Sequence, residues 1–79
     1  MESLSGPGAV VGTRRLEKAI EADRVAVAYV ADDADLMIKN RLNALCARHG
    51  VRVVGVASMT ELGKACGIDV PSASAGLLK

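Results

Sequence analysis

The hydrophobic positions of this chain predict short strands that alternate with helices. Four apolar runs are typical of buried strands: 9–11, 25–30, 51–56 and 73–78. Three intervening segments have the apolar spacing or the end signals of helices: 13–22, 32–49 and 58–66. Strands that alternate with helices indicate an α/β domain, in which helices cover a sheet.

Each predicted helix carries recognisable end signals. Thr13 is expected to be the N-cap of the first helix, because its hydroxyl can accept a hydrogen bond from a first-turn amide. The carboxylates of 32–35 suit the N-terminus of the second helix, which carries a partial positive charge. Gly50 is expected to end that helix. Ser58 and Glu61 form a capping box at the start of the third helix.

The first eight residues differ in character from the rest of the chain. Gly6 and Gly8 surround Pro7, and such a segment breaks regular structure. We therefore expect a flexible N-terminal leader over 1–8 and a single domain over 9–79. The N-terminus lacks the features of a secretion signal, and no apolar run reaches the length of a membrane span. These observations predict a cytoplasmic protein.

The composition limits the functions that the domain can have. The formal net charge is +1, far from the strongly basic balance of a general nucleic-acid binder. Tyr29 is the sole aromatic residue, so the chain lacks the base-stacking platform that single-strand binders use. Cys46 and Cys66 fit no zinc pattern, and we interpret them as buried thiols in a reducing compartment. Any RNA function must therefore come from a local patch.

A cationic patch of this kind lies at the start of the first predicted helix. Gly12 and Thr13 precede Arg14 and Arg15, and Lys18 follows one turn later. Cations at a helix N-terminus oppose the helix dipole, and a bound polyanion would compensate for that cost. Exposed first-turn amides, a glycine and three cations together make an anion site. The alternative is a solvated helix face with ion pairs inside the helix.

The order of several motifs resembles that of a known family. The Gly12–Arg15 motif is followed by the strand at 25–30, by the carboxylates at 32–35, and by Leu62-Gly63-Lys64-Ala65-Cys66-Gly67 with the loop after it. Over nearly all of 9–78 the chain resembles the L-seven-Ae ribosomal protein family, especially its small bacterial YbxF-like branch. The resemblance implies a three-layer α/β/α sandwich around a central mixed sheet of about four strands.

The resemblance also implies a ligand, the kink-turn, which is a sharply bent RNA element with tandem sheared G·A pairs. In the family, residues after the glycine contact the guanines of these pairs, and the loop before the last strand covers an extruded base. Carried over by position, the first surface consists of Gly12, Thr13, Arg14, Arg15 and Lys18. The second surface consists of Ile68, Asp69, Val70, Pro71 and Ser72, with Lys64 on the preceding helix.

The residue types of the first surface suit that ligand. The major groove of regular A-form RNA is too deep and narrow to read, whereas a kink opens it to a helix end. Arginine can donate two hydrogen bonds to O6 and N7 of guanine, and Gly12 allows the backbone to approach closely. Arg15 departs from the family, where Glu or Gln at this position accepts a hydrogen bond that arginine cannot accept. We therefore expect Arg15 to use guanine acceptors or phosphate.

The residues alone leave a second class of function open. A protein-interaction module on the same fold, without specific RNA binding, would set Arg14 and Arg15 against an acidic protein surface. An enzyme is disfavoured because no nucleophile, base and orienting group occur together, and we expect neither a cofactor nor a metal. The expected partner is kink-turn RNA, in ribosomal RNA or a riboswitch, and with it the ribosome. No membrane partner is expected, and the small domain favours a monomer.

Overall fold

The computed structural model describes residues 4 and 6–79, which form four strands and three helices. In chain order these are β1 (Ala9–Val11), α1 (Thr13–Glu21), β2 (Val25–Ala31), α2 (Leu36–His49), β3 (Arg52–Val56), α3 (Met59–Ala65) and β4 (Ser74–Leu78). The elements lie where the hydrophobic pattern predicts them. The main difference is that α2 begins after the carboxylates of 32–35 rather than with them.

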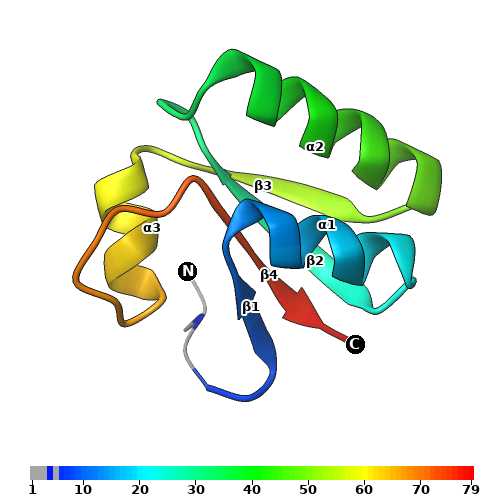
Figure 1. Cartoon of the computed structure of the whole chain (residues 1–79), viewed down its shortest axis with the longest axis horizontal. Coiled ribbons are helices and arrows are strands. Elements are labelled where there is room, and N and C mark those ends of the chain that lie inside the picture. The colour runs from blue at the N-terminus through cyan, green and yellow to red at the C-terminus, as the bar shows by residue number, and fades with distance from the viewer. Residues whose placement is uncertain (1–3, 5) are drawn as a thin grey trace.

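The strands form one mixed sheet in the order β1-β4-β2-β3 (Figure 1). The last strand, β4, lies between the first two and runs antiparallel to both, so that Ala75 is opposite Val11 of β1 and Tyr29 of β2. β2 and β3 are parallel, with Tyr29 opposite Val54, and α2 supplies the crossover that a parallel pair requires. The first and last strands of the domain therefore pair with each other, and β1 forms one edge of the sheet.

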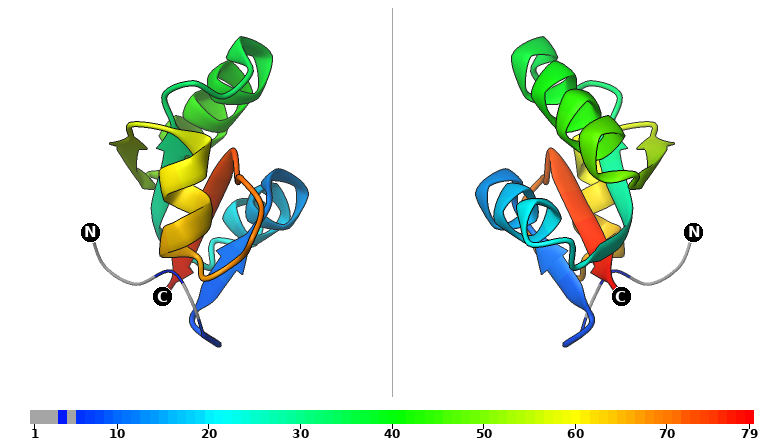
Figure 2. Two further views of the ribbon diagram at one scale, coloured as in Figure 1. Left: turned by 90° about the vertical axis from the view of Figure 1, so that its left-hand side faces the viewer. Right: turned by 90° about the vertical axis from the view of Figure 1, so that its right-hand side faces the viewer.

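Helices cover both faces of the sheet, which confirms the predicted α/β/α sandwich (Figure 2). On one face, Leu16 and Ile20 of α1 share a buried cluster with Leu42 and Cys46 of α2. On the other face, α3 buries Leu62 in a second cluster. Both clusters consist mainly of aliphatic side chains, so the removal of apolar surface from water holds the three layers together.

Leu4 belongs to the core on the α3 side of the sheet, although the sequence placed it in a flexible leader. Its side chain is fully buried, and its N–H donates to the carbonyl of Ala65 (3.1 Å). Burial of a leucine side chain stabilises the fold by about 1.5–3 kcal/mol, which outweighs the breaking effect of the nearby glycines and proline. Residues 1–3 and 5 of the expected leader lie outside the described residues.

All three helices begin at the same end of the sheet. β1, β2 and β3 point in the same direction, because β4 is antiparallel to β1 and β2 and β3 is parallel to β2. Each of these strands leads into a helix, and β4 starts at that same end. The loop of residues 66–73 runs from the far end of α3 back to the start of β4, as the left view of Figure 2 shows.

Candidate nucleic-acid interface

The N-terminus of α1 is a cationic helix end without a side-chain cap among the described residues. Gly12 is the N-cap residue, with φ 101° and ψ 144°. Arg14 and Arg15 are exposed in the first turn, which contains no acidic residue. The first amides of a helix lack intrahelical partners, so these N–H groups are available to an acceptor on another molecule.

The other two helix N-termini are occupied by acceptors from the protein itself. Asp35 accepts a hydrogen bond from a first-turn N–H of α2 (2.8 Å), and Ser58 accepts one from the N–H of Glu61 in α3 (3.1 Å). Asp33, which the sequence placed at the start of the second helix, instead accepts from the N–H of Met59 in α3 (2.8 Å). Among the described residues, α1 is the one helix whose first-turn amides have no side-chain acceptor.

Thr13 is not the N-cap that the sequence predicts, because its hydroxyl is used elsewhere. Its Oγ1 lies 2.9 Å from Oγ of Ser74, a fully buried residue at the start of β4. The N–H of Gly12 donates to the carbonyl of the same serine (3.2 Å). These bonds fasten the start of α1 to β4. Sequence reasoning missed Ser74, and no local signal points to a partner 61 positions away.

Glu17, an acidic residue of α1, is paired outside its own helix. The alternative drawn from the sequence had ion pairs inside the helix, but the carboxylate of Glu17 pairs with Arg41 of α2 (2.9 Å). At about 100° per residue, Glu17 lies nearly opposite Arg15 on the helix. The pair contributes little stability because the Arg41 side chain is exposed. The pair holds this negative charge on the α2 side of the helix, nearly opposite Arg15.

The loop after α3 and the outer side of α3 enclose a hollow of about 230 Å³. It is lined by Thr60, Lys64, Ile68, Asp69, Val70 and Pro71. The structure thus brings Lys64 together with four of the five loop residues that the sequence assigned to the second surface. Thr60 is an additional lining residue, for which the sequence carries no signal beyond its place in the first turn of α3.

Gly63 allows the loop to lie directly against α3. It is buried, and a Cβ at this position would overlap the carbonyl oxygen of Val70 and lie 3.2 Å from Cα of Pro71. Sequence reasoning quoted Gly63 in a motif but gave it no role. A glycine inside a helical pattern is the signal that could have revealed this role, because such a glycine often has a packing reason.

Ser72 differs from the other predicted loop residues because it is buried. Its N–H donates to the carbonyl of Met59 (3.0 Å), and its hydroxyl donates to the carbonyl of Ser74 (2.8 Å). Ser72 therefore fixes the loop instead of facing outward. Since the same Ser74 carbonyl also accepts from Gly12, one residue connects the loop to the start of α1. The end of the loop and the start of α1 consequently meet at the start of β4.

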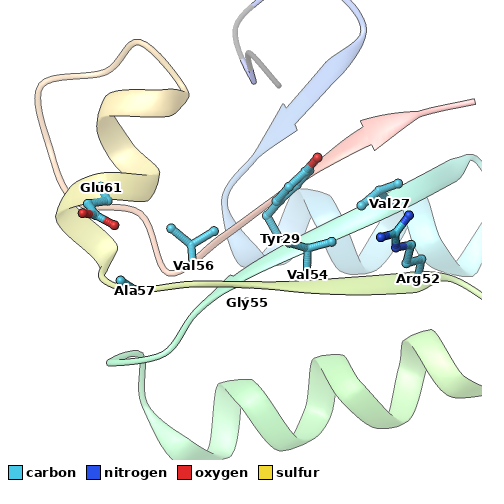
Figure 3. Close-up of a pocket in the computed structure, with 8 residues that line it drawn as sticks. All are labelled: Val27, Tyr29, Arg52, Val54, Gly55, Val56, Ala57 and Glu61. Atoms are coloured by element: carbon cyan, nitrogen blue, oxygen red, sulfur yellow. The ribbon is translucent and has the colours of Figure 1, made fainter. Parts of the chain in front are cut away.

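A larger hollow, of about 830 Å³, lies on the sheet face that α3 covers only in part (Figure 3). It is lined by Val27, Tyr29, Arg52, Val54, Gly55, Val56, Ala57 and Glu61. Its two charged residues, Arg52 and Glu61, are at opposite ends, with apolar side chains between them (Figure 3). This hollow therefore does not bring together the groups that acid–base chemistry requires.

Cysteine, histidine and acidic side chains are the other groups of this chain that could carry chemistry. Cys46 and Cys66 are free and buried, and burial raises the pKa of both thiols. Among residues 4 and 6–79, no group of three or more His, Cys, Asp or Glu side chains is placed to hold a metal ion. Within the same part of the chain, no helix combines the length and the apolar character needed to cross a membrane.

Comparison with known proteins places this chain in a family. The profile of the Ribosomal protein L7Ae/L30e/S12e/Gadd45 family matches residues 3–79. The chain belongs to this family. The resemblance that the sequence suggested is therefore confirmed.

Individual members of the L7Ae family are similar over most of the chain. RNA-binding protein BH0128 of Halalkalibacterium halodurans is 39% identical over 70 residues, which are 89% of this chain and 85% of the relative. RNA-binding protein YbxF of Geobacillus stearothermophilus is 37% identical over the same shares. The solved structure of the Giardia lamblia 15.5kD RNA binding protein superimposes with a TM-score of 0.85 at 29% identity, over 91% of this chain and 61% of the longer protein. The family and the RNA-binding names of these members point to a non-enzymatic protein, as the sequence predicted.

Proposed function

We propose that this L7Ae-family protein is an RNA-binding protein that recognises kink-turns and stabilises their bent conformation. RNA binding is supported by the family and by the names of its similar members. The observation that carries the finer proposal is the arrangement at one end of the sheet. There the uncapped, cationic start of α1 and the end of the loop after α3 are both hydrogen-bonded to Ser74, and the same loop lines a hollow against α3.

In this proposal the start of α1 enters the major groove where the kink opens it. Arg14 donates two hydrogen bonds to O6 and N7 of a guanine in a sheared pair, a contact worth about 1–3 kcal/mol of discrimination. Arg15 binds a second guanine or a phosphate, and Lys18 binds phosphate. Gly12 brings the backbone close to the RNA, and the free amides of the first turn, Thr13 included, bind a phosphate oxygen.

The hollow beside α3 receives the extruded base. Ile68, Val70 and Pro71 offer an apolar wall, and Val70 is already 62% exposed in the free protein. Lys64 at the edge of the hollow neutralises the phosphate of the same nucleotide. Asp69 supplies an acceptor for a base N–H group. Contact with aliphatic side chains replaces the aromatic stacking that this chain cannot provide.

Recognition of a shape explains how RNA binding is compatible with a net charge of only +1. A protein that binds the kinked conformation better than the extended one shifts the equilibrium between them by the difference in affinity. The contacts need only be complementary to one bent element, since deformation of the RNA itself contributes selectivity. Few phosphate contacts are then sufficient.

A titration with doubly labelled RNA tests the proposal, because fluorescence transfer reports bending directly. One hairpin carries a standard kink-turn, and in the control hairpin Watson–Crick pairs replace the sheared G·A pairs. We expect tight binding and bending of the first hairpin alone. Arg14→Ala should weaken this binding by about 1–3 kcal/mol and reduce the preference for G·A pairs. Lys18→Ala should mainly lower the dependence of affinity on salt.

Arg52→Ala provides the matched control, because Arg52 is exposed at the opposite end of the sheet and its loss changes the net charge equally. It should bind both hairpins like the unmodified protein. Weak, salt-sensitive binding to both hairpins alike would contradict the proposal, since the start of α1 would then be a general anion patch. The protein-interaction module would in that case become the better explanation.

We further propose that one chain binds one kink-turn in the cytoplasm, in ribosomal RNA or a riboswitch. All residues of both surfaces come from a single copy, so a monomer suffices for recognition. The family is named for ribosomal proteins, which supports ribosomal RNA as the first target to examine. Co-sedimentation with ribosomal particles in a sucrose gradient tests this setting.

A further inference from the structure

A groove beside α1 continues the cationic surface beyond the residues discussed so far. The groove has a volume of about 250 Å³ and is lined by Val10, Arg15, Lys18, Ala19, Ala22, Arg24 and Leu78. We propose that it holds the sugar–phosphate backbone of one RNA stem that flanks the kink, with Arg24 as the most distant contact. This inference rests on the proposed function, because the RNA must be placed by Arg14 and Arg15 first.

The charges around the groove favour an anionic occupant. Its three charged lining residues, Arg15, Lys18 and Arg24, are all cations. The acidic residue next to Arg24 is directed elsewhere, because Asp23 pairs with His49 of α2 (2.9 Å). In the part of the chain that the structure describes, Arg24 takes part in neither the Arg41–Glu17 ion pair nor the His49–Asp23 hydrogen bond. A phosphate in the groove therefore meets no carboxylate on the lining.

The shape of the groove also suits a sugar–phosphate backbone. Ala19 and Ala22 place only methyl groups on this side of α1, so a chain of riboses can lie close to the helix. The stretch from Arg15 to Ala22 rises by about 10 Å, and Arg24 extends the line beyond the helix. That length spans more than one phosphate, whereas a single bound anion would need only one end of the groove.

The backbone of Arg24 is fixed by hydrogen bonds on both sides. Its N–H donates to the carbonyl of Ala19 (2.9 Å), and its carbonyl accepts from the N–H of Lys79 (2.8 Å). The preceding Asp23 has φ 57°, a left-handed turn that connects the end of α1 to β2. Arg24 thus starts from a held position at the end of the groove, which reduces the entropy lost when it binds.

RNA is a better candidate than an acidic protein because the groove is continuous with the first surface. Arg15 and Lys18 belong to both. A stem that leaves the kink beside α1 would pass these residues and then reach Arg24. An acidic protein, in contrast, would have to compete with the RNA for Arg15 and Lys18.

The test combines Arg24→Gln with kink-turn RNAs whose two flanking stems are shortened one at a time. The substitution removes the charge and keeps the two backbone hydrogen bonds. We expect Arg24→Gln to weaken binding to the full-length RNA on the order of tenfold and to lower the salt slope by about 1. Shortening one of the two stems should weaken RNA binding by the unmodified protein by a similar factor. The same shortening should cause no further loss of RNA binding by Arg24→Gln.

Arg52→Gln is the matched control, and it should respond to stem length like the unmodified protein. Two results would overturn the inference: full affinity of Arg24→Gln for the long RNA, or an equal loss on every stem length. The G·A-replaced hairpin separates this test from that of the proposed function. If the protein still discriminates between the hairpins while Arg24→Gln has no effect on affinity, the inference about the groove is wrong and kink-turn recognition stands. If discrimination is absent, the proposed function fails as well.

Discussion

Gly12 has a backbone conformation that other residues rarely adopt, and it connects β1 to the cationic helix end. A Cβ at this position would meet no heavy atom within 4 Å, so only the backbone restricts the residue type. Gly12→Ala should therefore lower the free energy of unfolding by about 1–3 kcal/mol, the usual cost of such strain. Unfolding in denaturant, monitored by circular dichroism, measures this change in the free energy of unfolding.

Gly8→Ala is the matched control for this prediction. A Cβ at Gly8 also meets open space, but the residue lacks a positive φ. Its effect on the free energy of unfolding should stay within about 0.5 kcal/mol. If both variants unfold at the same denaturant concentration, the φ of Gly12 does not limit this position.

Single residues also show where local sequence rules are insufficient. Thr13 has the side chain of an N-cap, yet its hydroxyl bonds to Ser74, and the cap position falls to Gly12. Asp33 has the charge of a cap for the second helix, yet it caps α3. Local rules recognised the correct types of residue in both cases. They could not select the partner, because β4 and α3 approach these residues only after the sheet has formed.

At the scale of elements, the loop of residues 66–73 depends on how closely α3 allows it to approach. Gly63→Ala would place a methyl group against the backbone of Val70 and Pro71, which cannot rotate away as a side chain can. The free energy of unfolding should fall by about 1–3 kcal/mol, as for other overpacked sites. Amide shifts of Ile68, Asp69 and Val70 should change in a ¹H–¹⁵N spectrum.

Gly55→Ala serves as the comparison for the loop variant. Its Cβ would lie 3.1 Å from Oδ1 of Asp32, a side-chain end that can move aside. Gly55→Ala should lower the free energy of unfolding less than Gly63→Ala does. It should leave the amide resonances of Ile68, Asp69 and Val70 unchanged. Unchanged resonances of Ile68, Asp69 and Val70 in Gly63→Ala would show that α3, not the loop, accommodates the extra methyl group.

The sequence predicted the elements better than their arrangement. Periodicity is a local property, so the helices and strands could be placed from the chain alone. The order β1-β4-β2-β3 depends on contacts between distant segments, and the family resemblance implied only a mixed sheet. The first surface was predicted because Gly12 to Lys18 is one continuous segment. The sequence did not indicate that Arg24 lines a groove with Arg15 and Lys18, because Arg24 reaches that groove only through the turn at Asp23.

At the scale of the whole molecule, β4 makes the three layers interdependent. Leu77 and Ala75 contribute to the cluster under α3, and Leu78 contributes to the cluster under α1 and α2. β4 also pairs with strands on both of its sides. Loss of this strand would expose both clusters at once, so we expect the domain to unfold in one cooperative transition.

The two cysteines test this expectation because each lies in a different layer. Cys46 is buried in the cluster of α1 and α2, and Cys66 is buried in the cluster of α3. Only the thiolate reacts with iodoacetamide, and burial raises the pKa of both thiols. Both should therefore resist alkylation at pH 8 in the folded protein. Peptide mapping across a denaturant series should show that they become reactive at the same midpoint.

The raised pKa values of the same thiols also make the stability of the fold depend on pH in the alkaline range. The pKa in the folded state lies above the ordinary value of about 8.5, so the unfolded state releases these protons first. Their contribution to stability is complete below that value and is lost as the pH rises through the folded-state pKa. Cys46→Ala and Cys66→Ala should each reduce this alkaline loss.

Alkylation of Cys66 alone at low denaturant would contradict unfolding in one cooperative transition, since α3 and its loop would then open while the α1–α2 layer stays folded.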